Sequence, residues 1–360
     1  MTKLKKVFVG MSGGVDSSVS ALLLKEQGYE VTGIFMKNWS GDDFGLQSEC
    51  PWEVDQKDAE AVCHKVGIPF RSYNFEKEYR EKVVEYFFEE YKKGRTPNPD
   101  VMCNKEIKFK LFLDKALAEG ADFIATGHYV RLIYDGQFSI FNLLMGVDAN
   151  KDQSYFLYNL TQEQLGRCLF PVGAYIKSEI RELAARAGLP NAGKPDSQGI
   201  CFIGEINVHD FLKQRLGEKQ GEIIDLENNI KVGEHKGAHF YTVGQREGLG
   251  IGGAPMPYFV CATDITKNII YVVMGSENRK LFKQTVTLEN LHLISPGSQT
   301  EGKNLSASVR YRHKPQPGKL QKCDNKWEFQ FLEPQRAVTP GQSLVIYDND
   351  ICIGGGVIEN

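Results

Sequence analysis

Residues 7–31 read VFVGMSGGVDSSVSALLLKEQGYEV, which is the pattern of an apolar strand, a glycine-containing turn and a helix. A turn of this kind presents free backbone N–H groups and the positive end of the helix dipole to an anion. Gly13 and Gly14 allow the backbone to approach that anion closely, and the neighbouring serines add hydroxyl donors. The stretch therefore predicts a phosphate site at residues 10–17.

The chemistry of this turn differs from that of an ordinary P-loop. A P-loop places a lysine after its glycines to hold the β- and γ-phosphates, whereas here no lysine follows until Lys25. We therefore expect ATP to be cut between the α- and β-phosphates, with pyrophosphate held in the turn and Mg²⁺ near Asp16. The run SGGVDSSV resembles the SGGxDS motif of the PP-loop ATP pyrophosphatases, enzymes that adenylate an oxygen and then displace it.

The surrounding sequence predicts an α/β fold followed by β-rich units. Short apolar runs at 5–11, 29–36, 68–75 and 121–128 alternate with helical patterns, which favours a doubly wound parallel sheet, Rossmann-like in its layout. From about residue 205, glycine and asparagine turns separate short runs rich in Val, Ile, Tyr and Thr. This pattern is typical of a barrel or sandwich.

Composition indicates a soluble globular class of protein. The 360 residues are 41% hydrophobic and 25% charged, with a net charge of −3. No apolar run is long enough for a membrane span, so we expect a cytoplasmic protein without a membrane partner. Basic residues nevertheless outnumber acids between Lys303 and Lys326, where Asp324 is the one acid. That segment fits either a polyanion-binding patch or an ordinary solvated loop.

Two of the eight cysteines stand in polar Pro-Asp contexts. Cys103 lies in TPNPDVMCNKEIKF (96–109), just before a predicted helix and near lysines, so we expect a lowered thiol pKa. Asp100 lies within one turn of it, as a candidate acid/base. Cys201 lies in GKPDSQGICFIGE (193–205), on a predicted flexible loop. No C-x-x-C occurs, and we predict no structural metal site.

Six motifs together resemble the bacterial tRNA-specific 2-thiouridylase family: GMSGGVDSSV, NPDVMCN, KDQSYFL, DSQGICFI, YTVGQREGLGI and VTPGQSLVIYD. They follow in family order from residue 10 to about 348. The resemblance implies three parts: a PP-loop ATPase domain at 1–205, a small central β domain at 206–279, and a C-terminal tRNA-binding β-barrel at 280–360.

The resemblance also implies a reaction. The substrate would be the wobble uridine, U34, in the anticodon arm of tRNAs for lysine, glutamate and glutamine. ATP would adenylate the oxygen on C2 of the base. Cys201 would receive sulfur as a persulfide from a donor protein, either a cysteine desulfurase or a sulfur relay protein. Cys103 would be the nucleophile that releases the sulfur, leaving a Cys103–Cys201 disulfide, with Asp100 as acid/base.

Binding residues follow by similarity, position by position. The implied ATP contacts are Gly10, Met11, Ser12, Gly13, Gly14, Val15, Asp16, Ser17, Met36 and Gly127. The implied tRNA contacts are Asn98, Pro99, Asp100, His128, Lys151, Asp152, Gln153, Arg310, Tyr311, Arg312 and Gln342. In the barrel, the run SVRYRHK predicts a basic strand with an aromatic side chain for stacking.

Three alternatives stay open on the sequence. Another PP-loop ligase, such as an amidotransferase or an argininosuccinate-type synthetase, would need ATP but neither thiol nor an RNA-binding barrel. A non-catalytic RNA-binding protein would keep the turn without its chemistry. An iron–sulfur cluster is a third, because Cys103, Cys201 and Asp100 would supply three ligands.

Overall fold

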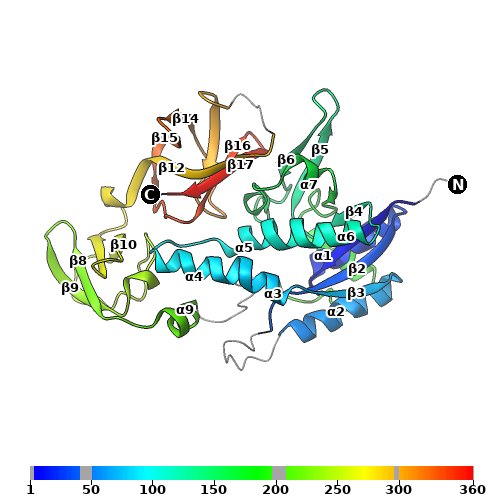
Figure 1. Ribbon diagram of the computed structural model, residues 1–360, viewed down its shortest axis with the longest axis horizontal. Coiled ribbons are helices and arrows are strands. Elements are labelled where there is room, and N and C mark those ends of the chain that lie inside the picture. The colour runs from blue at the N-terminus through cyan, green and yellow to red at the C-terminus, as the bar shows by residue number, and fades with distance from the viewer. Residues whose placement is uncertain (1–3, 41–50, 197–207, 296–299, 360) are drawn as a thin grey trace.

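The computed structural model describes residues 4–40, 51–196, 208–295 and 300–359, which form three sheets with their helices (Figure 1). A five-stranded sheet and most of the helices belong to the first half of the chain, a four-stranded sheet follows, and an eight-stranded sheet contains the C-terminal strands. No helix within these ranges is both long and apolar enough to cross a membrane.

The first sheet is parallel, as the sequence predicts, with strand order β3-β2-β1-β4-β7. Its strands are β1 (Lys6–Met11), β2 (Glu30–Lys37), β3 (Phe70–Asn74), β4 (Phe123–Ala125) and β7 (Cys168–Leu169). The chain runs outward from β1 to β3 on one side and returns at β4 on the other. The reversal leaves a crevice at the carboxyl end of β1, where open α/β sheets bind ligands.

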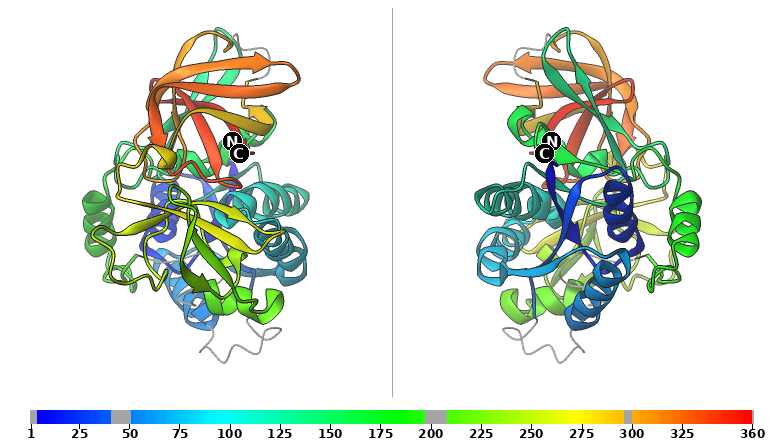
Figure 2. Two further views of the ribbon diagram at one scale, coloured as in Figure 1. Left: turned by 90° about the vertical axis from the view of Figure 1, so that its left-hand side faces the viewer. Right: turned by 90° about the vertical axis from the view of Figure 1, so that its right-hand side faces the viewer.

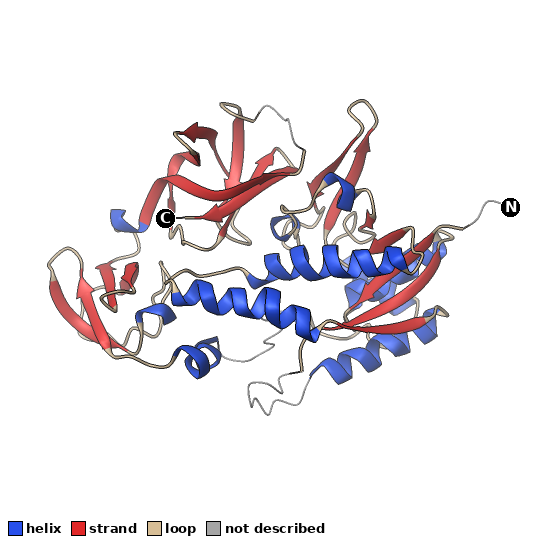
Figure 3. Ribbon diagram, viewed as in Figure 1, coloured by secondary structure: helices blue, strands red, loops and turns tan. Residues whose placement is uncertain are grey.

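Helices cover both faces of this sheet (Figure 3). The helices of this part of the chain are α1 (Val15–Glu26), α2 (Pro51–Val66), α3 (Glu76–Tyr79), α4 (Glu85–Lys92), α5 (Pro99–Met102), α6 (Leu113–Ala118) and α8 (Lys177–Arg186). Helices α1, α2 and α6 contact the sheet strands, whereas α4 lies away from the sheet, toward the central unit (Figure 1). The pleat of β1 divides the core, because Val7 and Val9 pack with α1, α2 and α8 while Phe8 packs on the opposite face. Both faces are apolar because both are buried.

The helix that carries Cys103 begins earlier than the sequence predicts. Asn98 caps it, accepting a hydrogen bond from the N–H of Val101 at 3.2 Å, and Pro99 occupies the first turn. From α5 the helix continues through a π-helical stretch, η3 (Cys103–Phe112), into α6. A second π-helical stretch, η2 (Arg80–Val84), joins α3 to α4. Cys103 therefore lies inside a helix.

The C-terminal strands form a closed six-stranded barrel, in the order β12-β15-β14-β13-β16-β17, with β12 paired back to β17. They are β12 (Phe282–Leu293), β13 (Asn304–Ser308), β14 (Gln316–Cys323), β15 (Lys326–Arg336), β16 (Ser343–Asp348) and β17 (Ile351–Ile358). A hairpin of β5 (Val130–Asp135) and β6 (Ile140–Met145) extends the sheet through β17 and stands beside the barrel in each view (Figure 2). One buried cluster, including Leu143, Tyr347 and Cys352, continues from the first sheet into the barrel.

The central unit is small and mixed. Its four strands have the order β10-β11-β8-β9, with β8 and β11 parallel. Its elements are α9 (Val208–Leu216), β8 (Gly221–Asp225), β9 (Ile230–His235), η5 (Ala238–Phe240), β10 (Tyr258–Asp264) and β11 (Ile269–Met274). The remaining short helices are η4 (Ser154–Phe156), α7 (Gln162–Leu165) and η6 (Arg279–Leu281).

The predicted basic strand in the barrel is wrong. The strand β13 ends at Ser308, and residues 309–312 form a bend and a turn. Arg312 has a φ of 61°, a left-handed conformation that a strand does not contain. The alternating basic and aromatic residues lie in a loop, in which Arg310 and Arg312 are exposed.

A single loop, residues 94–98, joins all three units. The Arg95 guanidinium makes two hydrogen bonds with Glu289 of β12, at 2.9 and 3.1 Å, and its Nε lies 2.8 Å from Glu90 of α4. The N–H of Thr96 donates to the carbonyl of Pro340 at 2.9 Å, and its hydroxyl shares a 2.9 Å hydrogen bond with Thr242 of the central unit. This loop leads directly into the cap of α5.

Replacing Arg95 tests how much the protein depends on this junction. Arg95→Met would leave Glu90, which is 6% exposed, with Lys93 as its remaining cationic partner. We expect a loss of about 2 kcal/mol in unfolding free energy, because a buried charge loses a charged hydrogen-bonding partner. Arg71→Met, which breaks an exposed pair with Glu119, should cost less than about 1 kcal/mol. Equal thermal unfolding midpoints for the two variants would contradict the role of the junction.

Candidate functional site

The predicted phosphate turn lies between β1 and α1, at the crevice of the parallel sheet. Gly13 has a φ of 74°, and a Cβ atom there would lie 2.4 Å from the carbonyl oxygen of Asp55. Only glycine fits this position without displacing α2. The side-chain amide of Asn191 donates to the Gly13 carbonyl at 2.8 Å, so the turn is held from both sides.

Three other predicted ATP residues, Gly10, Met36 and Gly127, lie at or near the ends of β1, β2 and β4. A Cβ on Gly127, just after β4, would lie 2.7 Å from the backbone nitrogen of Ser17. Met36 lies near the end of β2, with its methyl 3.0 Å from a Cβ built on Gly10. Gly10 and Gly127 are therefore places of close backbone approach. The structure brings together the ends of β1, β2 and β4, as the sequence predicts.

Asp16, in the first turn of α1, has two partners that the sequence analysis missed. Lys177 lies 2.6 Å from its Oδ1, and the Tyr129 hydroxyl donates to the same oxygen at 2.7 Å. One carboxylate beside a phosphate site suits Mg²⁺, which is held through one or two carboxylates together with phosphate oxygens. Lys177 stands at the start of α8, after a strand of only two residues that no pattern in the sequence reveals.

A cluster of cations continues from Lys177. Asp196 accepts from Lys151 at 2.5 Å, Lys177 at 2.9 Å and Arg181 at 2.9 Å. Partial burial alone would raise the pKa of Asp196, but hydrogen bonds from Lys151 and Lys177 outweigh it and lower the pKa to about 2. The carboxylate is therefore ionised at every physiological pH.

The expected low pKa of Cys103 is wrong for this conformation. The side chain is fully buried, because the helix begins at Asn98 and turns residue 103 into the core. Burial raises the pKa of the thiol, although the charge of Lys108 and the hydroxyl of Tyr79 act in the opposite direction. Asp100 is near enough that its charge adds to the rise.

His128 is also buried, and its predicted contact with RNA is not available in this conformation. It is 7% exposed, lies between Phe109 and Phe170, and shares a 2.8 Å hydrogen bond with the Thr126 hydroxyl. Burial, with the charge of Lys108, lowers the pKa of His128 well below its ordinary value. The imidazole is therefore neutral at pH 7.

The three residues of the predicted 151–153 contact differ in setting. Lys151 is half-buried and holds Asp196. Asp152 accepts from the N–H of Gly146 and from Ser154, and Gln153 accepts from the N–H of Tyr129. The hydrogen bonds of Asp152 and Gln153 thus hold the loop that carries Lys151.

Two barrel residues of the predicted tRNA contact, Tyr311 and Gln342, contact residues of the first half of the chain. Tyr311 packs on Phe156, with ring centroids 4.3 Å apart, next to the 151–153 loop. Gln342 donates to the carbonyls of Thr96 and Pro97 at 2.9 and 3.1 Å, directly before Asn98. The structure thus brings together the two barrel sites, the α5 cap and the 151–153 loop.

Exposed cations continue from this place over the barrel. Lys303 and Lys326 form ion pairs with Asp348 and Glu359. The others are exposed and have no ion pair with any residue in the described ranges: Arg310, Arg312, Lys314, Lys319 and Lys322. Such a surface attracts a polyanion.

Cys201 lies outside the described residues. Among the described cysteines, Cys63, Cys168 and Cys352 are buried, and burial raises the pKa of each thiol. No group of three potential metal ligands occurs within the described ranges.

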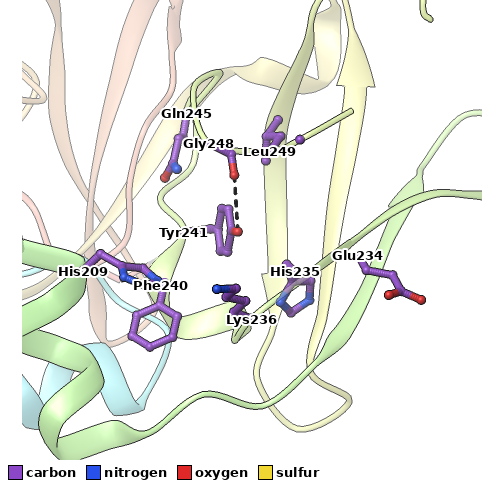
Figure 4. Close-up of a pocket in the computed structure, with 10 residues that line it drawn as sticks. His209, Glu234, His235, Lys236, Phe240, Tyr241, Gln245, Gly248 and Leu249 are labelled. Carbon is purple, nitrogen blue, oxygen red and sulfur yellow. Dashed lines mark hydrogen bonds between the residues drawn. The ribbon is translucent and has the colours of Figure 1, made fainter. Parts of the chain in front are cut away.

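A cavity of about 460 Å³ lies in the central unit, and none of the predicted site residues lines it (Figure 4). His209, Lys236 and Tyr241 are among its lining side chains. His235, also in the lining, accepts from the N–H of Gly237 at 3.0 Å through Nδ1.

Family models match nearly the whole chain. Residues 5–205 match the "tRNA methyl transferase HUP domain", 209–274 the "tRNA methyl transferase PRC-barrel domain", and 283–358 the "Aminomethyltransferase beta-barrel domain". A partial likeness to a solved 4-thiouridine synthetase–RNA complex with bound ATP has 19% identity and a TM-score of 0.36, covering 58% of this chain and 50% of that chain. A likeness at this level adds nothing to the assignment.

Curated relatives are similar over their full length. The chain is 51% identical to the tRNA-specific 2-thiouridylase MnmA of Francisella philomiragia, covering 98% of this chain and 99% of the relative. It is 50% identical to the protein of the same name from Bacillus licheniformis, over 99% and 95%. The chain belongs to the tRNA-specific 2-thiouridylase family.

Proposed function

We propose that this protein is a tRNA-uridine 2-sulfurtransferase that uses ATP. The observation that carries the proposal is the phosphate turn without a lysine of its own, in a chain half identical over its whole length to proteins named for 2-thiolation. The substrate is the wobble uridine, U34, of tRNAs for lysine, glutamate and glutamine, and the products are 2-thiouridine, AMP and pyrophosphate.

The reaction has three steps, after which a reductant restores the two thiols. The C2 oxygen of the uridine attacks the α-phosphorus of ATP, and pyrophosphate leaves from the turn at residues 10–17. Sulfur from a persulfide on Cys201 then replaces that oxygen, which departs with AMP. The Cys103 thiolate attacks the Cys201 sulfur, the S–S bond to the transferred sulfur breaks, and its electron pair stays on the sulfur bonded to C2. The resulting Cys103–Cys201 disulfide is reduced by an external thiol.

Asp16 and residues 98–100 have proposed roles that agree with their positions beside the phosphate turn and the Cys103 helix. Asp16 would hold Mg²⁺, which supplies charge neutralisation of the phosphates when it is bound. Asn98, Pro99 and Asp100 lie at the start of the helix that carries Cys103, where an extruded base would meet the thiol. Asp100 is the proposed acid/base. The sulfur donor is a cysteine desulfurase or a relay protein.

We also propose the division into an ATPase domain (1–205), a central domain (206–279) and a tRNA-binding barrel (280–360). The hairpin β5–β6 lies within residues 1–205 in the sequence, but its strand β6 pairs with β17 of the barrel. An iron–sulfur cluster at Cys103 and Cys201 is the alternative to the persulfide route. Iron in anaerobically purified protein, absent from the Cys103→Ser variant, would favour the cluster.

The central experiment follows sulfur in the tRNA. Protein, ATP, Mg²⁺, tRNA and a persulfide donor are incubated, and the nucleosides are analysed by mass spectrometry. Wild type and Cys323→Ser, a control thiol on the barrel, should form 2-thiouridine, while Cys103→Ser and Cys201→Ser should form none. With labelled sulfur followed on the protein, Cys103→Ser should still acquire sulfur at Cys201, whereas a persulfide on Cys103 of the Cys201→Ser protein together with thiolated tRNA would contradict these roles.

The same incubation, with ATP cleavage followed alongside the nucleosides, separates the rival functions. With a methyl donor added to the mixture, a methylated nucleoside in place of 2-thiouridine would favour the methyl transfer named in the family model of residues 5–205. Wild-type activity in the Cys103→Ser protein would favour another PP-loop ligase. Failure to cleave ATP with tRNA present would favour a protein that only binds RNA.

Because Cys103 is buried, its chemistry requires the site to open. In the free protein, alkylation of Cys103 should be at least about tenfold slower than that of the more accessible Cys323, the factor that an opening of about 1.4 kcal/mol imposes. Adding tRNA and ATP should speed the alkylation of Cys103. Rapid labelling in the free protein would contradict the buried state, and no change with substrates would contradict its opening.

The barrel cations should bind tRNA through phosphates. Replacing Arg310 and Arg312 with alanine should weaken binding and lower the salt slope by about one unit per lost contact. Replacing Arg71 and Arg167, near the amino ends of strands β3 and β7, removes the same charge and should leave the slope unchanged. Equal slopes for the two double variants would reassign the barrel cations to an ordinary solvated face.

A further inference from the structure

The described residues leave the phosphate turn without a cation of its own. Lys25, the next lysine after the turn, donates to the carbonyls of Val66 and Gly67 and so is directed toward the end of α2. Backbone N–H groups and serine hydroxyls remain, yet a pyrophosphate carries several negative charges. Cations must therefore come from elsewhere in the fold.

Helix α8 supplies them. Lys177 and Arg181 are one turn apart and so share a face of α8, which packs against α1. Lys177 reaches Asp16, in the first turn of α1, and its side chain is 13% exposed. A partly desolvated ammonium group at this place interacts with an anion more strongly than one on the surface.

These cations are already paired with a carboxylate. Asp196 accepts from Lys177 and Arg181, at 2.9 Å each, through the same oxygen, while its other oxygen accepts from Lys151. One carboxylate thus holds three cations beside a turn built for anions. Asp16 also pairs with Lys177, so three cations face two carboxylates, and the cluster keeps a net positive charge for a phosphate ligand.

We propose that Lys177 and Arg181 bind the β- and γ-phosphates of ATP, and that Asp196 holds these two cations when no nucleotide is bound. The proposal rests on the proposed function, because it deepens the same ATP site. On binding, the phosphate oxygens take the place of the Asp196 carboxylate, and Lys151 keeps its pair with Asp196. The two residues also retain pyrophosphate after the α–β bond has broken.

The two kinds of substitution should act in opposite directions. Lys177→Met removes a phosphate partner, so binding of ATP and pyrophosphate should weaken about tenfold or more, the factor expected for a hydrogen bond to a charged group. Arg181→Met should act in the same sense. Asp196→Asn removes the competing charge, so pyrophosphate should bind more tightly. A purely structural role for Asp196 would give weaker binding instead.

Calorimetry on the full-length protein tests this with three ligands: inorganic pyrophosphate, ATP and AMP. AMP lacks the β- and γ-phosphates, so its affinity should be the same in wild type, Lys177→Met and Arg181→Met, which also shows that the variants are folded. Arg215→Met, which breaks an exposed pair with Glu85, is the matched control and should change nothing.

The outcomes separate this inference from the proposed function. If wild type binds ATP and pyrophosphate but Lys177→Met and Arg181→Met bind them equally well, the subsite is wrong and the function stands. Loss of AMP binding in both variants would also overturn it, since the residues would then be structural. If wild type binds neither ATP nor pyrophosphate, both the function and the subsite fail.

Discussion

The constraint on which the rest of this structure depends is the fixed position of the loop at residues 94–98. Arg95 joins helix α4 to the barrel through Glu90 and Glu289, and Thr96 contacts both the barrel and the central unit. Because this loop ends at Asn98, the cap of α5, the arrangement of three units sets the place of Asp100 and Cys103. A change in the contacts of this loop would therefore displace the start of the helix that carries the buried Cys103 thiol.

The phosphate turn has a second constraint, which is electrostatic. Its glycines and Asn191 fix the backbone, but the charges around it balance one another: Lys177 bridges Asp16 and Asp196, and Lys194 bridges Asp55 and Asp58. In our proposal, phosphate oxygens of ATP take the place of the Asp196 carboxylate on Lys177 and Arg181, while Asp16 stays available for Mg²⁺. The absence of a lysine within the turn therefore does not leave the site without positive charge.

Sequence reasoning succeeded where the signal is local. The strand, turn and helix at residues 6–26 and the parallel sheet follow from patterns a few residues long, and the structure confirms them. Two predictions were wrong. The low pKa expected for the Cys103 thiol is wrong because the helix starts at Asn98 and buries residue 103. The basic strand is wrong because Arg312 has a left-handed backbone conformation. Lys177 was missed because the preceding strand, Cys168–Leu169, has two residues, and its pairing with Asp16 is a contact across 161 positions of the chain.

The position at which ATP is cut tests the central claim most directly. ATP labelled separately on its α- and γ-phosphates is incubated with the protein, Mg²⁺ and tRNA, and the labelled products are separated. The account predicts that the α label appears in AMP, through adenylated base, and that the γ label appears in pyrophosphate. Recovery of the α label in ADP and the γ label in free phosphate would contradict it, because the turn would then serve γ-phosphoryl transfer.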